Sequence, residues 1–107
     1  MAFFGENGIH AWAQAYQNPS ADYRDAYNIS SVADVGTGQI GFNFSVAAIN
    51  NDYAFVGLSG NVSGNTTSGR FVQNDATVTT SYFELRTRSS TTLVDETLVN
   101  VIVVSDN

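Results

Sequence analysis

Cysteine and lysine are both absent from this 107-residue chain. Without cysteine the chain can form no disulfide, thiolate nucleophile or cysteine-based zinc site, so its stability must come from packing or from oligomerisation. Positive charge is limited to four arginines against ten acidic residues, and the formal net charge is −6. Phosphate backbones and anionic membranes attract clustered cations, so both nucleic-acid binding and adhesion to an acidic membrane are disfavoured.

Charged residues of either sign are scarce, at 13% of the chain, about half the usual share of roughly 25%. Ser, Thr, Asn and Gly take their place, which predicts a polar but mostly uncharged surface. The length fits one domain over residues 1–107, with residues 1–8 as an N-terminal arm. That arm has no basic region and no long apolar run, so we expect no signal peptide, and no stretch approaches the roughly 18 apolar residues that span a membrane.

The pattern of apolar residues has a period of two and predicts strands rather than helices. In residues 10–16 three alanines share one face, while His10, Trp12, Gln14 and Tyr16 share the other. Residues 40–46 alternate in the same way, which is typical of a half-buried antiparallel strand. Residues 53–59 are apolar on both faces, so we expect that strand to lie centrally in a sheet.

The predicted fold is all-β, an antiparallel β-sandwich of about seven or eight strands, with a jelly-roll-like arrangement or a small barrel as alternatives. Turns are predicted at 7–8, 34–38, 47–52 and 89–92, and a solvent-exposed loop at 60–69. The predicted strands lie at 10–16, about 26–33, 40–46, 53–59, 70–73, 77–79, 82–88 and 99–104.

Catalytic chemistry has few candidates in this chain. A catalytic triad needs a base beside its nucleophile, and His10 is the sole histidine, for which a structural role is the simpler interpretation. The carboxylate pairs Asp22/Asp25 and Asp95/Glu96 could serve a glycosidase only at a fixed separation. We therefore expect no enzyme and no cofactor, and keep a small polysaccharide depolymerase as the third hypothesis.

Aspartates are more simply explained as turn residues, because their side chains commonly cap their own backbone there. No twelve-residue calcium-loop pattern is present, and a calcium ion between turns or subunits stays open. Aromatic residues could stack on sugar rings, but for Trp12 we favour packing in a core or a subunit interface. The aspartates in predicted turns are Asp34, Asp52, Asp75 and Asp95.

A set of short motifs follows in order from about Ile9 to Val104. Together they resemble the small β-sandwich domain at the distal, C-terminal end of bacteriophage tail fibres and receptor-binding proteins, of the kind found in cyanophages and other marine phages. The motifs are Ala11-Trp12, Tyr27 to Val32, Gly36 to Gly38, Ile40 to Phe44, Asp52 to Ala54, Phe83 to Thr87 and Val99 to Val104.

The resemblance implies a non-enzymatic structural protein of a phage virion, exposed on the particle as a tail-fibre-like module that binds a host surface glycan or protein. Its expected location is the virion, on a tail fibre or the capsid surface, after synthesis in the host cytoplasm. Expected partners are other virion proteins and further copies of the chain, with a homotrimer favoured by analogy. The candidate receptor contacts are Asn61, Ser63, Asn65, Thr66, Thr67, Ser89, Ser90 and Thr91.

Two departures from the family pattern favour an alternative. Many relatives carry a proline before the Asn-Tyr-Ala segment, where this chain has Ala47-Ala48-Ile49-Asn50. Relatives also usually end a long fibre, whereas this chain starts at Met1 directly before the domain, as a stand-alone virion protein or a trimmed piece would. The alternative is a head-decoration or cement protein that stabilises the capsid, and its distinguishing sign would be a large apolar face.

Overall fold

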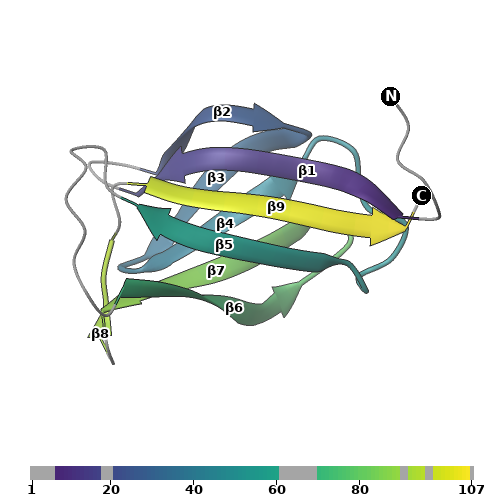
Figure 1. Ribbon diagram of the computed structural model, residues 1–107. Helices are drawn as coiled ribbons and strands as arrows, with labels where there is room; N and C mark the ends of the chain where they lie inside the picture. The colour runs from purple at the N-terminus through teal and green to yellow at the C-terminus, as the bar shows by residue number, and fades with distance from the viewer. Residues whose placement is uncertain (1–6, 18–20, 61–69, 90–91, 96–97, 107) are drawn as a thin grey trace.

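Two antiparallel sheets pack face to face in the computed structural model, which describes residues 7–17, 21–60, 70–89, 92–95 and 98–106 (Figure 1). Sheet A has the strand order β2-β1-β9-β5 and sheet B the order β3-β4-β7-β6, with β8 paired to β7. The predicted all-β sandwich is confirmed. The strands are β1 (Asn7–Tyr16), β2 (Asp22–Tyr27), β3 (Ile29–Gly36), β4 (Gln39–Phe44), β5 (Ala54–Gly60), β6 (Arg70–Val78), β7 (Tyr82–Ser89), β8 (Thr92–Leu93) and β9 (Leu98–Asp106).

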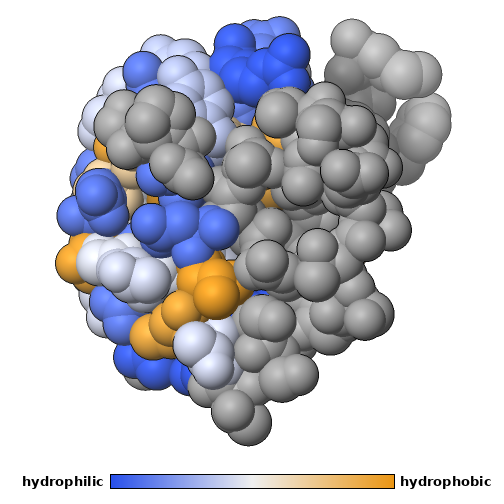
Figure 2. Space-filling view, turned by 90° about the vertical axis from the view of Figure 1, so that its left-hand side faces the viewer, coloured by the Kyte–Doolittle hydropathy of each residue, from blue (hydrophilic) through white to orange (hydrophobic). Residues whose placement is uncertain are grey.

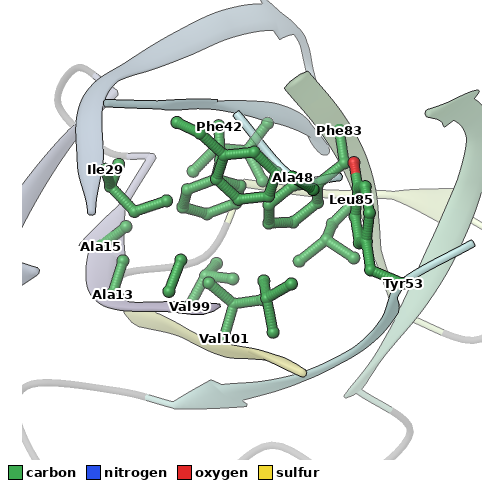
Figure 3. Packing of buried hydrophobic residues seen from close by; sticks show 14 residues of the cluster. Ala13, Ala15, Ile29, Phe42, Ala48, Tyr53, Phe83, Leu85, Val99 and Val101 are labelled. Carbon is green, nitrogen blue, oxygen red and sulfur yellow. The ribbon is translucent and has the colours of Figure 1, made fainter. Parts of the chain in front are cut away.

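The core between the sheets follows from the period-two pattern. The three alanines of β1 are buried, as are alternate valines of β9, while sheet B contributes large aromatic side chains. The rings of Phe42 and Phe83 stack with their centroids 5.1 Å apart, and Phe55 lies 4.6 Å from Phe83. Small side chains on β1 and β9 of sheet A thus leave space that the aromatic rings of β4 and β7 fill (Figure 3), and the Phe55 ring of β5 in sheet A packs against them.

Asn28 divides one predicted strand into two. Residues 26–33 were expected to be continuous, but the backbone at Asn28 is left-handed, with φ of 57°. The chain leaves β2 in sheet A there and enters β3 in sheet B. Asparagine tolerates this conformation better than most residues because its short amide can hydrogen-bond locally.

Several other predicted boundaries were wrong. Strand β5 lies at the edge of sheet A rather than at its centre, and pairs with β9. Asn7 and Gly8 belong to β1 instead of forming a turn, and the two short strands expected at 70–73 and 77–79 are one irregular strand, β6. The described part of the chain contains no helix, and so none that could cross a membrane.

The two ends of the sandwich differ in what they carry. Asn7 pairs with Asp106, so the first and last described residues lie side by side at one end. Gly60 pairs with Leu98 at the other end of sheet A, and Arg70 pairs with Ser89 at the same end of sheet B (Figure 1). The sandwich therefore has an axis, with the chain ends at one end and the connections after β5 and β7 at the other.

Candidate functional site

The described residues that flank the predicted receptor contacts lie at that second end, which we call the loop end. Asn61, Ser63, Asn65, Thr66, Thr67, Ser90 and Thr91 lie outside the described residues. Ser89 is the last residue of β7, where it pairs with both Arg70 and Thr92. Arg70, Ser89 and Thr92, which flank the two candidate stretches, therefore lie next to one another.

A network of hydrogen bonds connects the described segments at the loop end. The N–H of Gly38, at the β3–β4 turn, donates to Asp95 Oδ1 at 2.7 Å, and the Gly38 carbonyl accepts the Thr87 N–H at 2.8 Å. Asp95 thus caps the backbone of a segment 57 positions away, not its own turn as expected from the sequence. Asp34 and Asp75 lie within β3 and β6, not in turns.

Thr87 is the centre of this network. Its side chain is fully buried, and its hydroxyl lies within hydrogen-bond distance of Gln17 Oε1, at 3.0 Å, and of the Val94 carbonyl. The Val94 N–H in turn donates to the Thr87 carbonyl at 3.0 Å. Strand β7, the segment after β8 and the end of β1 are thereby held together, so the ends of the strands that carry the candidate stretches have fixed positions.

Figure 2 shows the loop end face-on. The described residues there present a mostly hydrophilic or neutral surface, with limited hydrophobic areas. This agrees with the low charge and the high Ser, Thr and Asn content of the chain. A surface of this kind offers hydrogen-bond donors and acceptors.

The outer face of sheet A has a different chemistry. Tyr27, Trp12, Ile102 and Val56 lie opposite one another on β2, β1, β9 and β5, and form one row across the sheet. The next row runs through Asp25, Gln14, Asn100 and Leu58. A groove of about 520 Å³ lies between the rows, lined mainly by the side chains of Trp12, Val56, Leu58 and Ile102 together with the polar residues of the second row.

Large apolar side chains on this face are open to solvent. Leu58 is 69% exposed, Val56 58% and Trp12 37%, and Ile102, Val104 and Tyr27 are also partly or largely exposed. Trp12 is therefore not a core residue, so the part of the prediction that allowed core packing was wrong. The sequence signal was present in residues 53–58, apolar but for Gly57, and in residues 101–104, where apolar side chains occupy consecutive positions. Residues 53–59 were predicted to lie centrally because they are apolar on both faces, and only the face of Tyr53 and Phe55 packs against the core.

The polar side chains of the groove are joined to one another. Gln14 Nε2 donates to Asn100 Oδ1 at 3.1 Å. Asp25, the one carboxylate that lines the groove, accepts the N–H of Ala26 through Oδ1 at 2.9 Å. Hydrolysis of a glycosidic bond by paired carboxylates needs two such groups, and the groove-lining residues supply one.

His10 and Asn28 line a second, smaller pocket of about 440 Å³ near the chain-end side of the sandwich. The His10 ring packs edge-on against Phe44, with the centroids 4.7 Å apart. Asn28 Nδ2 lies 3.2 Å from His10 Nε2 and donates to the His10 carbonyl at 3.0 Å. This geometry gives His10 the structural role that the sequence favoured.

Burial also affects the hydroxyl group of one core tyrosine, Tyr53. Tyr53 donates through its hydroxyl to the Thr79 carbonyl at 2.7 Å, and the Tyr82 carbonyl lies 3.1 Å away. Desolvation by burial raises the pKa of Tyr53 to about 12. The phenol is therefore a neutral hydrogen-bond donor that ties β5 to the β6–β7 connection.

Within the described ranges no group of three or more His, Asp or Glu side chains is placed to hold a metal ion. Comparison with protein-family models, with curated proteins and with solved structures finds no match for this chain. The arguments for function therefore rest on the two surfaces, the loop end and the outer face of sheet A.

Proposed function

We propose that this chain is a non-enzymatic structural module of a bacteriophage virion, a tail-fibre-like domain that is exposed on the particle and binds a host surface receptor. The observation that carries the proposal is the axis of the sandwich. Asn7 and Asp106 pair at one end, while Gly60, Arg70, Ser89 and Thr92 mark the other. A domain attached to a particle through its chain ends would direct the loop end outward.

The chemistry of the loop end supports a hydroxyl-rich or amide-rich receptor. The stretches 61–67 and 89–91 are rich in Asn, Ser and Thr, which donate and accept hydrogen bonds without charge. Such side chains suit a host surface glycan or a protein loop. The Gly38–Asp95 hydrogen bond keeps the flanking strands in place, which lowers the conformational cost of binding.

Replacement of residues 61–65 by a short Gly-Ser linker tests the proposal. We expect the variant to fold, because these residues lie between strands, and to lose binding to bacterial cells measured by flow cytometry of labelled protein. Ile49→Ser is the matched control, since Ile49 is exposed in the connection at the chain-end side. Cell binding that is equal in the linker variant and the wild type would exclude the 61–65 stretch as the contact surface.

A head-decoration or cement protein is the second candidate function, and the apolar outer face of sheet A favours it. A decoration protein must bury such a face on a capsid shell, and Leu58 and Val56 offer one. Antibody-gold labelling or a reconstruction of the virion distinguishes the two. Label at the tail periphery supports receptor binding, and label spread over the head supports capsid decoration.

A further inference from the structure

We propose that the open edge of β5 binds an extended segment of another protein, which adds one strand to sheet A. Strand β5 ends the strand order of that sheet and pairs with β9 on one side only. In an antiparallel pair every second residue directs its N–H and C=O groups away from the partner strand. Residues 54–58 make no hydrogen bond to a described segment other than β9, so this row of backbone donors and acceptors can pair with an added strand.

The four edge strands of the two sheets differ in how they are protected. Edge strands are commonly blocked by charged side chains, proline or bulges, because an open edge recruits further strands. Strand β2 carries Asp22, Arg24 and Asp25, and β3 and β6 also contain charged residues. In all three strands the pairing with the neighbouring strand shifts register, and the extra residues lie on the edge strand. These three edges are therefore poor templates for a further strand.

Strand β5 has none of these protective features. Its seven residues, Ala54–Gly60, include no charged residue and no proline, and they pair with β9 without a shift of register. The edge is thus regular and uncharged over a length that matches an average strand. Among the edges of the described sheets, β5 is the one whose sequence and pairing favour strand addition.

The outer side of β5 indicates which side chains the added strand should carry. Val56 is 58% exposed and Leu58 69%, and both line the outer face of sheet A. Side chains that lie opposite one another on neighbouring strands are in contact, and apolar or β-branched pairs stabilise a sheet. We therefore expect apolar or β-branched residues at alternate positions of the partner segment, where they would cover Val56 and Leu58.

The inner side of β5 is packed before any partner binds. A Cβ at Gly57 would lie 2.9 Å from Val72 Cγ1 and 3.1 Å from Leu85 Cδ1, so side chains of β6 and β7 lie against this part of the strand. The Phe55 ring packs against Phe83 with the centroids 4.6 Å apart. Because these contacts hold β5 in an extended conformation, strand addition has a low conformational cost on this side.

The charge of the chain restricts the partner further. At a net charge of −6 the protein repels an acidic segment and attracts a basic one. The β5 edge itself carries no charge, so it offers no ion pair that would favour an acidic strand. The expected occupant is an extended segment that is uncharged or basic, which also disfavours a second copy of this acidic chain.

A synthetic peptide of alternating threonine and valine, with a lysine at each end, tests the inference on the whole chain. We expect saturable binding in isothermal titration calorimetry and slower hydrogen exchange at alternate amides of β5. A peptide of the same sequence that is N-methylated at each threonine and valine keeps the side chains and the charge but cannot donate to the carbonyl groups of β5. It should bind at least about tenfold more weakly.

Leu58→Lys and Val56→Lys introduce on β5 the charge that the other edges already carry. Each should raise the dissociation constant of the peptide at least about tenfold. Val46→Lys and Ile49→Lys are matched controls, because these residues are as exposed (68% and 65%) but lie outside the strands, and they should leave the constant unchanged. Circular dichroism checks that all four variants keep the fold.

A folded chain that does not bind the peptide would overturn the inference. Equal binding of the N-methylated peptide, or protection of β2 amides in place of β5 amides, would overturn it as well. Protection of β5 by self-association without peptide would contradict the assignment to a foreign segment. The inference does not rest on receptor binding at the loop end, and the lysine variants of β5 should leave the cell-binding experiment unchanged, so the two proposals can fail separately.

Discussion

Asn28 and Val46 are joined by two hydrogen bonds that run in opposite directions. The Val46 N–H donates to Asn28 Oδ1 at 2.7 Å, and Asn28 Nδ2 donates to the Val46 carbonyl at 3.1 Å. Because the same amide nitrogen also donates to the His10 carbonyl in sheet A, one side chain connects β1, the β2–β3 junction and the segment after β4. The two sheets are therefore tied at the residue where the chain crosses between them.

Asn28→Ala should destabilise the protein by about 2–4 kcal/mol, since it loses these hydrogen bonds and places an alanine in the left-handed region. Asn28→Gly loses the same bonds without the backbone strain, so its loss should be smaller. Urea unfolding of the two variants measures the difference. If Gly and Ala cost the same, the left-handed backbone contributes nothing to the effect.

Alanine substitutions at Gly38 and Gly41 should reduce the free energy of unfolding to different extents. A Cβ at Gly38, where φ is +68°, would lie 2.7 Å from both the Thr87 carbonyl oxygen and the Val94 nitrogen, which are backbone atoms that cannot move aside. We expect Gly38→Ala to cost more than about 2 kcal/mol of unfolding free energy. Thermal denaturation followed by circular dichroism gives the value.

At Gly41 the obstacle is the far end of the Tyr82 side chain. Gly41→Ala should therefore be the milder change, because Tyr82 can rotate away at the expense of its hydrogen bond to Glu84. In a Tyr82→Ala background the Gly41→Ala cost should fall further, as a double-mutant cycle would show. Additive effects would mean that the tyrosine does not obstruct this position.

The raised pKa of Tyr53 predicts that the protein loses stability at alkaline pH. Its folded pKa of about 12 lies above the unfolded value of about 10, so the native state holds the phenolic proton more tightly. The contribution is fully present below pH 10 and is lost as the pH rises from 10 to 12. Tyr53→Phe should shrink that alkaline loss in urea unfolding at a series of pH values, while Tyr27→Phe, which alters an exposed ring, should not. An unchanged pH profile in Tyr53→Phe would contradict the prediction.

Thr87→Val should cost about 1–3 kcal/mol, because it keeps the shape of the side chain but removes the single hydroxyl proton that lies between two acceptors, the Val94 carbonyl and Gln17 Oε1. Thr92→Val is the control, since Thr92 is exposed at the start of β8, and it should stay within about 0.5 kcal/mol. Chemical denaturation compares the two. Equal effects would show that the hydroxyl of Thr87 does not brace the loop end.

The period-two pattern of the sequence correctly predicted which residues of a strand share a face. The alternation in β1 placed Ala11, Ala13 and Ala15 on one face, and all three are buried. Periodicity says which residues share a face, but not whether a second layer covers that face. For this reason the prediction that residues 53–59 lie centrally did not foresee that Val56 and Leu58 are exposed.

Other features of the fold could not be predicted from the local sequence, because they depend on contacts between segments that are distant in the chain. The break at Asn28 carries no glycine or proline, so nothing in the local pattern ends a strand there. The Gly38–Asp95 contact that supports the loop end joins residues 57 positions apart, and a turn aspartate does not reveal which backbone it caps. Arg70 lies opposite Ser89 because β6 pairs with β7. Strands that are neighbours in the sequence can be expected to pair in antiparallel fashion, but the residues that lie opposite one another follow only once the strand boundaries are known.

The place of β9 between β1 and β5 also determines when this molecule can fold. Gln14 and Asn100 touch across the centre of sheet A although 86 positions separate them, and such long-range closure slows folding. On the ribosome, the hairpins β1–β2, β3–β4 and β6–β7 can form early, whereas β5 must wait for residues 98–106 to emerge. Synthesis is thus nearly complete before the groove on sheet A exists, and until then β5 and the β9-facing edge of β1 expose unpaired backbone that favours aggregation.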